Sequence, residues 1–318
     1  MSKLHLGLVG YGIWGQRILE NLVSMSVPVT VCDTDPARRR LSLKAGADAF
    51  VEQLESMPKV HGYIIATPAS THAAIISRLD DLGNQAALFV EKPLTDSASE
   101  AQLLTHRSGP PVYVMHIWTY HAGIRKLKEL LESGVIGAPT LLRSTRANWT
   151  SPRSDVDSLG NLAPHDLSIF HFLLGHLPHP SNASAEFVNG ALVGCVACLQ
   201  DDDGPPCILE VSNRYSEKRR EVRVHGEYGV LVLPDDTTGA INLIRGGGFI
   251  VPERTEAISY SGPSALETEL RAFLAYLNGD QGASLWDIQV GVDVVRAIDE
   301  IRTLACRRHD IAHSGEIQ

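Results

Sequence analysis

The chain has no apolar run long enough to span a membrane. A spanning helix needs about 20 consecutive, mostly apolar residues, and none of the 318 residues belongs to such a stretch. The amino terminus enters a strand-like segment directly, without the charged and apolar regions of a signal peptide. We therefore expect a cytoplasmic protein with no membrane partner.

Basic residues and cysteines are also sparse. The 28 Lys and Arg residues are outnumbered by 37 Asp and Glu residues, which gives a formal net charge of −9. This balance argues against nucleic acid as a partner. Five scattered cysteines are typical of reduced thiols. Cys195 and Cys198 have the spacing of a redox or metal pair, but they lie in an alternating, strand-like run with no second pair, so we expect no metal site.

Internal repeats and low-complexity linkers are absent too. A chain of this length exceeds the usual single domain, so two domains are expected. The pattern changes near residue 120 without a flexible tether. We therefore predict one domain over residues 1–120 and a second over residues 121–318.

The first domain alternates short β-rich runs with amphipathic helical stretches. This alternation is typical of a doubly wound parallel sheet, the Rossmann arrangement. Helices are expected after Asp35-Pro36 up to Ala45, and from Thr71 to Leu82. Strands are expected at Leu4–Gly10, Pro28–Asp33, Ala47–Val51, Gly62–Thr67, Ala86–Glu91 and Pro111–His116.

The second domain begins with a helical pattern that ends near Gly134 and continues with longer alternating runs. These runs predict an α+β domain with one large, mostly antiparallel open sheet. Helices are expected at Leu162–Leu174, Pro263–Asn278 and Asp287–Arg307. Strands are expected at Pro139–Trp149, Ala183–Val188, Gly194–Leu199, Cys207–Tyr215, Glu221–Gly226, Gly229–Leu233 and Ile241–Ile244.

A glycine-rich turn, Gly10-Tyr11-Gly12-Ile13-Trp14-Gly15, follows the first predicted strand and opens a helix. Asp33 ends the second predicted strand, which completes the context of a dinucleotide-binding fingerprint. Gly10 permits the tight turn, Gly12 lets backbone amides approach a pyrophosphate, and Gly15 allows close helix–strand packing.

Asp33 favours NAD over NADP, because a carboxylate accepts hydrogen bonds from ribose hydroxyls and repels a 2′-phosphate. Asp35 adds to this repulsion. Arg38 and Arg39 argue the other way, since an arginine after the second strand can clamp a 2′-phosphate. We expect NAD, with NADP the less favoured cofactor.

Two later motifs complete the pattern. Glu91-Lys92-Pro93 ends a predicted buried strand, and Pro164-His165-Asp166 lies in the predicted helix of the second domain. Together with the glycine motif, they resemble the glucose–fructose oxidoreductase/inositol dehydrogenase (Gfo/Idh/MocA) family over most of the chain. The resemblance implies that Lys92 lies beside the nicotinamide, polarises the substrate oxygen and helps to move its proton. It also implies a cis bond before Pro93.

The same resemblance implies roles for the loops around these motifs. His165 matches a histidine suited to general acid or base work, and Asp166 could orient a ring or cap the helix. Thr67 and Pro68 would line the cofactor, with His72 beside them. Glu91, Tyr11, Ile13 and Trp14 complete the expected cofactor site.

The chain departs from the family at Asn161, where many relatives have Asp. An amide can hydrogen-bond a sugar hydroxyl but cannot accept a proton near neutral pH, so proton transfer would fall to His165 and Lys92. His116 and Tyr120 are further candidates for substrate binding. Arg146 and Asn148 share a strand face and could meet substrate or line a subunit interface.

The motifs thus predict an NAD-dependent oxidoreductase that acts on a secondary hydroxyl or ketone of a sugar, cyclitol or nucleotide-linked sugar. The resemblance also implies a homodimer or homotetramer formed through the second domain's sheet. One alternative is an enzyme that keeps NAD bound for an internal redox cycle, as in dismutation or glycoside cleavage, and a cofactor that never exchanges would indicate it. The other is a non-catalytic NAD-binding sensor or partner protein, for which Asn161 is the single hint.

Overall fold

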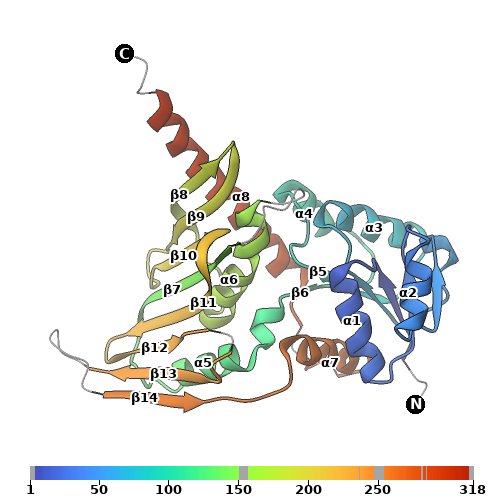
Figure 1. The fold of residues 1–318 in the computed structure, drawn as a ribbon, viewed down its shortest axis with the longest axis horizontal. Coiled ribbons are helices and arrows are strands. Elements are labelled where there is room, and N and C mark those ends of the chain that lie inside the picture. Colours follow the sequence, from blue (N-terminus) through green and yellow to red (C-terminus); the bar gives the residue numbers. More distant parts are fainter. Residues whose placement is uncertain are drawn as a thin grey trace. The chain divides into compact units, whose positions relative to one another are not determined.

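The computed structural model describes residues 4–149, 157–235, 237–246, 254–280, 282–283 and 285–314. The chain divides into two compact units, each with its own β-sheet (Figure 1). Unit 1 consists of Met1–Ile117 and Ala265–Val295, and unit 2 consists of Trp118–Ser264 and Arg296–Gln318.

Unit 1 is built on a six-stranded sheet with the order β3-β2-β1-β4-β5-β6. Every neighbouring pair is parallel, which confirms the predicted Rossmann arrangement. The strands are β1 (Leu6–Val9), β2 (Val29–Cys32), β3 (Ala49–Val51), β4 (Gly62–Ile65), β5 (Ala87–Glu91) and β6 (Val112–Met115). The helices are α1 (Ile13–Ser24), α2 (Arg38–Lys44), α3 (Ala69–Asp81), α4 (Ala98–Leu104), α7 (Ala265–Leu277) and the start of α8 (Ile288–Ser314), with 3₁₀ turns at Leu54–Ser56 and Ile117–Tyr120.

Alternate residues of the strands feed two hydrophobic cores, one on each face of this sheet. The first core joins Leu6, Leu8 and Phe89 to Ile18 of α1 and Phe273 of α7. The second joins Leu88 and Val90 to Ile76 of α3 and to Val292 and Val295 of α8. Helices therefore cover both faces of the sheet.

Residues 265–295 pack with unit 1, although the predicted division at residue 120 places them with the second domain. Their apolar side chains complete both cores of the parallel sheet. Hydropathy patterning shows that a helix buries a face but not which sheet it covers. The division into 1–120 and 121–318 stays a prediction about domains.

Unit 2 is built on an eight-stranded sheet with the order β14-β13-β12-β11-β7-β10-β9-β8. Only the β7–β10 pair is parallel among the described strands, so the predicted, mostly antiparallel sheet is confirmed. The elements are α5 (Ala122–Glu132), β7 (Pro139–Trp149), α6 (Ser158–Leu174), β8 (Pro180–Val188), β9 (Ala191–Leu199), β10 (Cys207–Ser212), β11 (Arg214–Gly226), β12 (Gly229–Leu233), β13 (Ala240–Arg245) and β14 (Arg254–Ser259).

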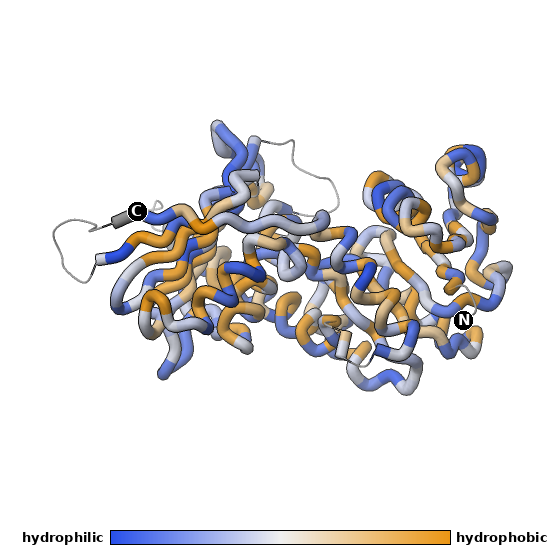
Figure 2. Tube along the Cα trace, turned by 90° about the horizontal axis from the view of Figure 1, so that it is seen from below, coloured by the Kyte–Doolittle hydropathy of each residue, from blue (hydrophilic) through white to orange (hydrophobic). Residues whose placement is uncertain are grey.

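One face of the large sheet is covered by α6, which packs on β7, β9 and β10, and by α5, which packs on β12 and β13. Orange, hydrophobic segments are visible in both units in Figure 2, and strands such as β1, β5 and β12 are largely buried. Cys195 and Cys198 lie three residues apart on β9. Residues at this spacing point to opposite faces of a strand, so the two thiols cannot share a ligand.

One strand prediction is wrong in detail. The run Cys207–Tyr215 is two strands, because β10 ends at Ser212 and β11 starts at Arg214. The two strands pair with opposite edges of β7, one parallel and one antiparallel. Alternation continues across the reversal, so the pattern gives no sign of it.

In the part of the chain that the structure describes, no helix is long and apolar enough to cross a membrane.

Candidate active site

A cavity of about 500 Å³ opens at the carboxyl ends of β1, β2 and β4 in unit 1. This is the edge at which parallel α/β sheets bind ligands. The cavity brings together residues predicted for the cofactor that are far apart in the sequence, namely Gly10, Gly12, Asp33, Thr67 and Pro68.

The glycines of the turn are required by close contacts. Gly10 has a φ of +94°, and a Cβ there would lie 2.8 Å from the carbonyl oxygen of Ala66. A Cβ on Gly15 would lie 2.2 Å from the carbonyl oxygen of Gly10. A Cβ on Gly12 would meet no atom within 4 Å and would occupy space beside the cavity that Gly12 lines. Any side chain at Gly12 would therefore take room from a ligand.

Helix α1 starts at Ile13, directly after this turn, with no side-chain cap and no acidic residue in its first turn. Free amides at a helix amino terminus attract anions. Gly10, Gly12 and the start of α1 therefore fit a dinucleotide pyrophosphate.

Asp33 holds the turn and the cavity wall together. Its Oδ2 accepts a hydrogen bond from the Tyr11 amide at 2.6 Å, and its Oδ1 accepts one from the Asp35 amide at 2.9 Å. A carboxylate has about four acceptor positions, so lone pairs remain for ribose hydroxyls.

The two arginines that argued for NADP have different surroundings. Arg38 lines the cavity, and its Nε lies 3.3 Å from Oδ2 of Asp35. Arg39 is absent from the lining, and its guanidinium stacks on Phe50 with its carbon 4.9 Å from the ring centroid. Arg39 also pairs with Glu52 at 3.3 Å. Only Arg38 is placed to meet an adenosine ribose.

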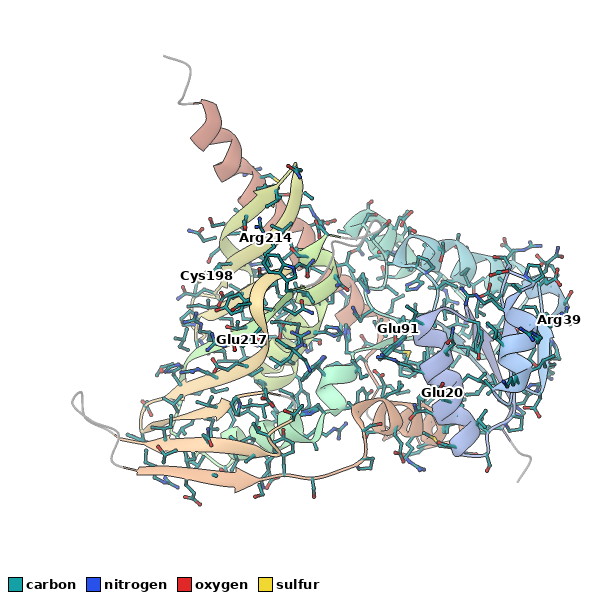
Figure 3. All side chains as sticks on the ribbon, in the orientation of Figure 1. Glu20, Arg39, Glu91, Cys198, Arg214 and Glu217 are labelled. Atoms are coloured by element: carbon teal, nitrogen blue, oxygen red, sulfur yellow. The ribbon has the colours of Figure 1, made fainter. Side chains whose placement is uncertain are left out.

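The remaining residues of the glycine motif differ in exposure. Tyr11 is buried in the core, whereas Ile13 is 80% exposed. Trp14 turns its indole toward the end of β5, where Nε1 donates to Oε1 of Glu91, a residue that Figure 3 shows beside α1. Tyr11 therefore serves the site through its backbone amide, and Trp14 through Glu91.

Glu91 and Lys92 close strand β5 with different surroundings. The Glu91 side chain is buried, and its Oε2 accepts a hydrogen bond from the Lys92 amide at 3.2 Å. Burial raises the pKa of Glu91, while the nearby Lys92 charge and the two donated hydrogen bonds oppose the rise. Lys92 is half-buried. The Lys92–Pro93 peptide bond is cis, as the family resemblance implied.

His72 links two loops of the site and does not line the cavity. The ring is 1% exposed. Its Nε2 lies 3.0 Å from the Thr67 carbonyl oxygen, and its Nδ1 lies 3.2 Å from the Pro93 carbonyl oxygen and 3.1 Å from that of Leu94. Burial lowers the pKa of His72. This histidine ties the Thr67-Pro68 loop to the Lys92-Pro93 loop.

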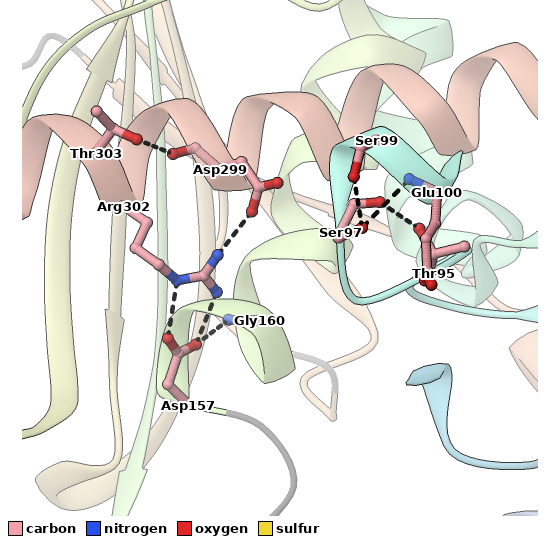
Figure 4. A network of polar contacts seen from close by, with 9 residues as sticks. All are labelled: Thr95, Ser97, Ser99, Glu100, Asp157, Gly160, Asp299, Arg302 and Thr303. Atoms are coloured by element: carbon pink, nitrogen blue, oxygen red, sulfur yellow. Dashed lines mark hydrogen bonds and ion pairs between the residues drawn. The ribbon is translucent and has the colours of Figure 1, made fainter. Parts of the chain in front are cut away.

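Unit 2 carries five further predicted residues, with Asn161 and His165 on α6, Arg146 and Asn148 on β7, and Tyr120 before α5. Asp157 caps this helix, because its Oδ1 accepts a hydrogen bond from the Gly160 amide at 2.7 Å (Figure 4). Arg302 of α8 holds the cap in place, with Nε 3.2 Å from Oδ2 of Asp157 and Nη1 2.8 Å from Asp299. The same figure shows the separate cap of α4 in unit 1, where Ser97 Oγ accepts from the Glu100 amide.

Asn161 and His165 are four residues apart on α6 and therefore lie on one face of that helix. The His165 ring meets Trp118 edge-on at 6.4 Å between centroids. Trp118 also contacts His121 at 5.2 Å, and His121 contacts Tyr260 at 5.7 Å. His165 thus belongs to an aromatic cluster of unit 2.

The structure gives Arg146 a different place from the predicted substrate contact. Its guanidinium is 3% exposed, and it donates to Asp166 from Nε at 2.6 Å and from Nη2 at 3.0 Å. Its flat face lies over Trp118 at 4.2 Å. Ser144 also donates to Asp166, so this carboxylate neither caps α6 nor orients the His165 ring. The Arg146–Asp166 pair thus supports one face of the Trp118 ring. Because Arg146 contacts α6, it does not lie on the open face of the sheet, where a subunit interface was considered.

The last three predicted substrate residues are also largely covered. His116, in unit 1, is 1% exposed and meets Trp286 edge-on at 6.3 Å. Tyr120 is 1% exposed and packs under the guanidinium of Arg125 at 5.2 Å. Asn148 is half-buried, and within the described ranges no donor reaches its Oδ1. Of these three residues, Asn148 is the least covered.

Sequence reasoning missed Tyr260 of the aromatic cluster and Glu269, a buried acid of α7. Both lie outside the recognisable motifs, and nothing in their spacing marks them. Among the described residues, no cluster of His, Cys, Asp and Glu could hold a metal ion.

Comparison with known proteins agrees with this geometry. Residues 4–108 match the model of an oxidoreductase family with an NAD-binding Rossmann fold, and residues 124–232 match the GFO/IDH/MocA C-terminal domain. The chain belongs to the Gfo/Idh/MocA family. It is an oxidoreductase with an NAD-binding Rossmann domain.

Individual Gfo/Idh/MocA relatives are distant. Inositol 2-dehydrogenase from Burkholderia cenocepacia (strain HI2424) is 26% identical over 315 residues, covering 89% of each chain. UDP-N-acetylglucosamine 3-dehydrogenase from Acidithiobacillus ferrooxidans has a TM-score of 0.80 at 22% identity, covering 96% of this chain and 98% of that one. A 3-ketoreductase from Actinomadura kijaniata, solved with TDP-benzene and NADP, has a TM-score of 0.81 at 18% identity, covering 95% and 98%. At these identities, the two solved structures support the fold alone.

Proposed function

We propose that this protein is a dehydrogenase that transfers a hydride between NAD and a secondary hydroxyl or ketone of a sugar, cyclitol or nucleotide-linked sugar. One observation carries the proposal. A single sheet edge in unit 1 combines a dinucleotide cavity, walled by Gly12 and Asp33, with a half-buried lysine at the end of β5.

The names of the relatives support the substrate class. One acts on inositol, a cyclitol, and another on a nucleotide-linked sugar. All such substrates present a secondary hydroxyl flanked by other hydroxyls. Such polyols need several neutral hydrogen-bonding groups around the reacting carbon.

NAD is proposed over NADP because the carboxylates of Asp33 and Asp35 face the expected position of the adenosine ribose. Asp35 also pairs with Arg38, the cation that could otherwise bind a 2′-phosphate. Asp33 and Asp35 both line the cavity. A 2′-phosphate would meet both negative charges. When bound, NAD supplies the nicotinamide ring that accepts or returns the hydride.

Each proposed catalytic residue has one task. The Lys92 ammonium donates a hydrogen bond to the substrate oxygen and takes or gives its proton. His165 serves as the second acid or base, because an imidazole titrates near neutral pH. Asn161 and Asn148 hold substrate hydroxyls, whereas Arg146 positions Trp118, and His116 and Tyr120 pack the surrounding core.

A panel of cyclitols, free sugars and nucleotide-linked sugars tests the substrate class, with NADH absorbance as the readout. We expect turnover with at least one polyol that has a free secondary hydroxyl, and none with its matched deoxy analogue. A panel in which every member stays silent with both NAD and NADP would contradict the proposal.

Asp33→Ala tests the cofactor assignment through binding alone. The variant should bind NAD more weakly and discriminate less against NADP, because it loses a ribose acceptor and a negative charge. Calorimetric titration of both cofactors measures the change, and Asp81→Ala, on the exposed end of α3, is the matched control. A wild-type protein that prefers NADP would show that Arg38 dominates.

We also propose that copies of the chain assemble as a homodimer or homotetramer through the face of the large sheet that α5 and α6 leave open. This face has a hollow of about 390 Å³, and Val196 beside it is 48% exposed. Arg143–Glu210 and Arg214–Glu186 pairs border it, and an Arg223–Glu221 pair lies on β11. A mixture of ion pairs and exposed apolar surface is typical of an interface.

A further inference from the structure

Glu269 is a completely buried acid of α7. It lies on the inner stripe of α7 with Leu266, Leu270 and Phe273, and its exposed fraction is 0%. Within the part of the chain that the structure describes, neither of its oxygens has a hydrogen-bond partner. Buried carboxylates are normally paired, so this residue requires an explanation.

The packing of α7 on the parallel sheet shows what Glu269 faces. Phe273 stacks on Phe89 of β5 with centroids 4.7 Å apart. A Cβ on Gly62, at the amino end of β4, would touch Phe273 and Leu277. The later turns of α7 therefore lie over the amino ends of the strands, and its earlier turns lie toward their carboxyl ends.

Glu269 and Glu91 then fall opposite each other. Glu91 is two residues beyond Phe89 on the same face of β5, a displacement of about 6.6 Å. Glu269 is four residues before Phe273 on the same stripe of α7, a displacement of about 6 Å in the same direction. The register therefore places the two carboxyl groups at corresponding positions, one step closer to Lys92 than the phenylalanine pair.

The electrostatics agree with this register. Burial raises the pKa of Glu269 well above its ordinary value, and the charge of Glu91 raises it further. Ionising two interacting buried carboxyl groups together is costly, and such pairs titrate as one system that holds a proton between two sites.

We propose that Glu269 is a positioning residue that shares one proton with Glu91 and thereby limits the negative charge that Glu91 presents to Lys92. The inference rests on the proposed role of Lys92 in moving the substrate proton. A full charge on Glu91 would hold the Lys92 ammonium tightly, whereas a charge divided between two carboxyls lets the amine give up its proton more readily.

Few other ionisable groups lie near this pair in unit 1. From β5 there is Lys92, and from α1 there is Arg17, whose guanidinium lies 5.5 Å from the Trp14 ring that bonds Glu91. From β6 and its end there are Tyr113 and His116, and from α7 there is Tyr276, which contacts Tyr113. Burial keeps Tyr113 neutral by raising its pKa. Asp287, which forms a β-bridge with Tyr113 and whose charge adds to this rise, is a further carboxyl of the group beside Glu91 and Glu269.

Infrared spectroscopy of the purified, substrate-free protein tests the shared proton. Exposed acids are ionised at about pH 8, so a carbonyl stretch of a protonated carboxyl at that pH reports a buried acid. We expect this band in the wild type and in Glu267→Gln, which removes a half-buried acid of the same helix that bonds Arg271. We expect its loss in Glu269→Gln. Absence of the band in the wild type, or its persistence in Glu269→Gln, would overturn the proposal.

The pH dependence of Lys92 acylation tests the positioning role without a substrate. N-hydroxysuccinimidyl acetate reacts only with the free amine, and peptide mass spectrometry follows Lys92 alone. Glu269→Gln should move the midpoint upward, because Glu91 then carries the whole charge, and Glu91→Gln should move it downward. The expected shifts are about one pH unit, with none in Glu267→Gln.

The two Glu variants separate the possible outcomes. Shifts in the same direction, or no shift in either variant, would overturn the positioning role. If one variant does not fold, the other still gives a signed prediction. Neither measurement uses a substrate, so a silent substrate panel would refute the proposed function and leave this test intact.

Discussion

Lys92 differs from the residue before it in what it can reach. Adjacent side chains of a strand point to opposite faces, so Glu91 turns into the core beside α7 while Lys92 leaves the sheet at its edge. Glu91 is occupied by the indole of Trp14 and the amide of Lys92. Lys92 is therefore the residue of the motif for which we propose a substrate contact.

Replacing Lys92 tests whether this residue, and not Glu91, acts on the substrate. Lys92→Ala should lower turnover by about 10²–10⁴-fold, the usual contribution of a general acid or base, and should leave NAD affinity within a small factor. Steady-state rates and calorimetry measure the two effects. Lys126→Ala, which removes a surface lysine paired with Glu129, is the control and should change neither. Near-normal turnover in Lys92→Ala would remove the lysine from the mechanism.

Asn161 gives a sharper prediction, because the chain departs from its family there. If the amide holds a substrate hydroxyl, Asn161→Ala should mainly raise KM, at a cost of roughly 0.5–1.5 kcal/mol for one neutral hydrogen bond. Asn161→Asp should then bring little gain. A rise of orders of magnitude in Asn161→Asp, from a barely active wild type, would instead support a non-catalytic NAD-binding protein.

At the level of elements, the site of unit 1 is made by the ends of strands and by the loops after them. Strands β1, β2, β4 and β5 end at one edge, and His72 joins the loops after β4 and β5. The carbonyl oxygens of Thr67 and Pro93 belong to segments 26 residues apart. This link lets the loop that lines the cofactor cavity support the loop that carries Lys92.

The His72 link predicts a pH dependence of stability. Burial lowers the pKa of His72 below the ordinary 6.5. As the pH falls, the unfolded chain therefore binds a proton at His72 more readily than the folded protein does. His72 therefore contributes stability above the unfolded pKa, and this contribution falls as the pH drops below it. Thermal unfolding midpoints measured between about pH 7 and pH 5 should fall less steeply in His72→Gln.

His106→Gln is the matched control, because it changes another histidine of unit 1, one that lies outside the site. Its slope should equal that of the wild type. A steeper slope in His72→Gln would mean that the ring is charged in the folded protein and that its carbonyl contacts favour the imidazolium.

Motifs made of consecutive residues could be predicted from the sequence, and contacts between distant elements could not. Gly10 to Gly15, Asp33 and Thr67-Pro68 meet at one cavity as expected, because parallel strands bring their ends together. Arg146 was expected to face substrate and instead pairs with Asp166. Polarity marks both residues as candidates, but only the packing of α6 on β7 shows that they neutralise each other.

At the level of the whole molecule, the open face of the large sheet is the surface through which we propose that copies of the chain associate. Residues of this face alternate with those that α6 covers, so Thr145 and Glu210 lie on it while Ser144 and Arg146 do not. Burial of its ion pairs by a second copy would strengthen them only with well-matched partners. The proposed assembly is therefore expected to be sensitive to a single added charge.

Val196→Glu should weaken assembly, because it places an unpaired carboxylate in the proposed interface, where burial is costly. Size-exclusion chromatography with light scattering measures the mass. Leu103→Glu is the control, since Leu103 of α4 in unit 1 is 70% exposed and should leave the mass unchanged. A wild-type monomer, or an unaltered mass in Val196→Glu, would contradict the proposed interface.

The predicted parallel Rossmann sheet and the mostly antiparallel second sheet are confirmed, but β14 was not among the predicted strands. The unit that the last helices join could not be foreseen. Amphipathic patterns show that α7 and the start of α8 bury one face. Only the structure shows that Leu270 and Phe273 complete one core of the parallel sheet, and that Val292 and Val295 complete the other.

This late contribution bears on the order in which the protein can fold during its synthesis. The ribosome delivers Leu6 to Met115 first, but their cores remain incomplete until α7 and the first turns of α8 have also emerged. A nascent chain that has released all six strands of the parallel sheet still exposes the apolar side chains that Phe273 and Val295 will cover. The strands of unit 2 lie before residue 265, so they can pair before α7 has been synthesised. Although most of the cofactor-binding unit precedes unit 2 in the sequence, it is therefore completed only when residues 265–295 are made.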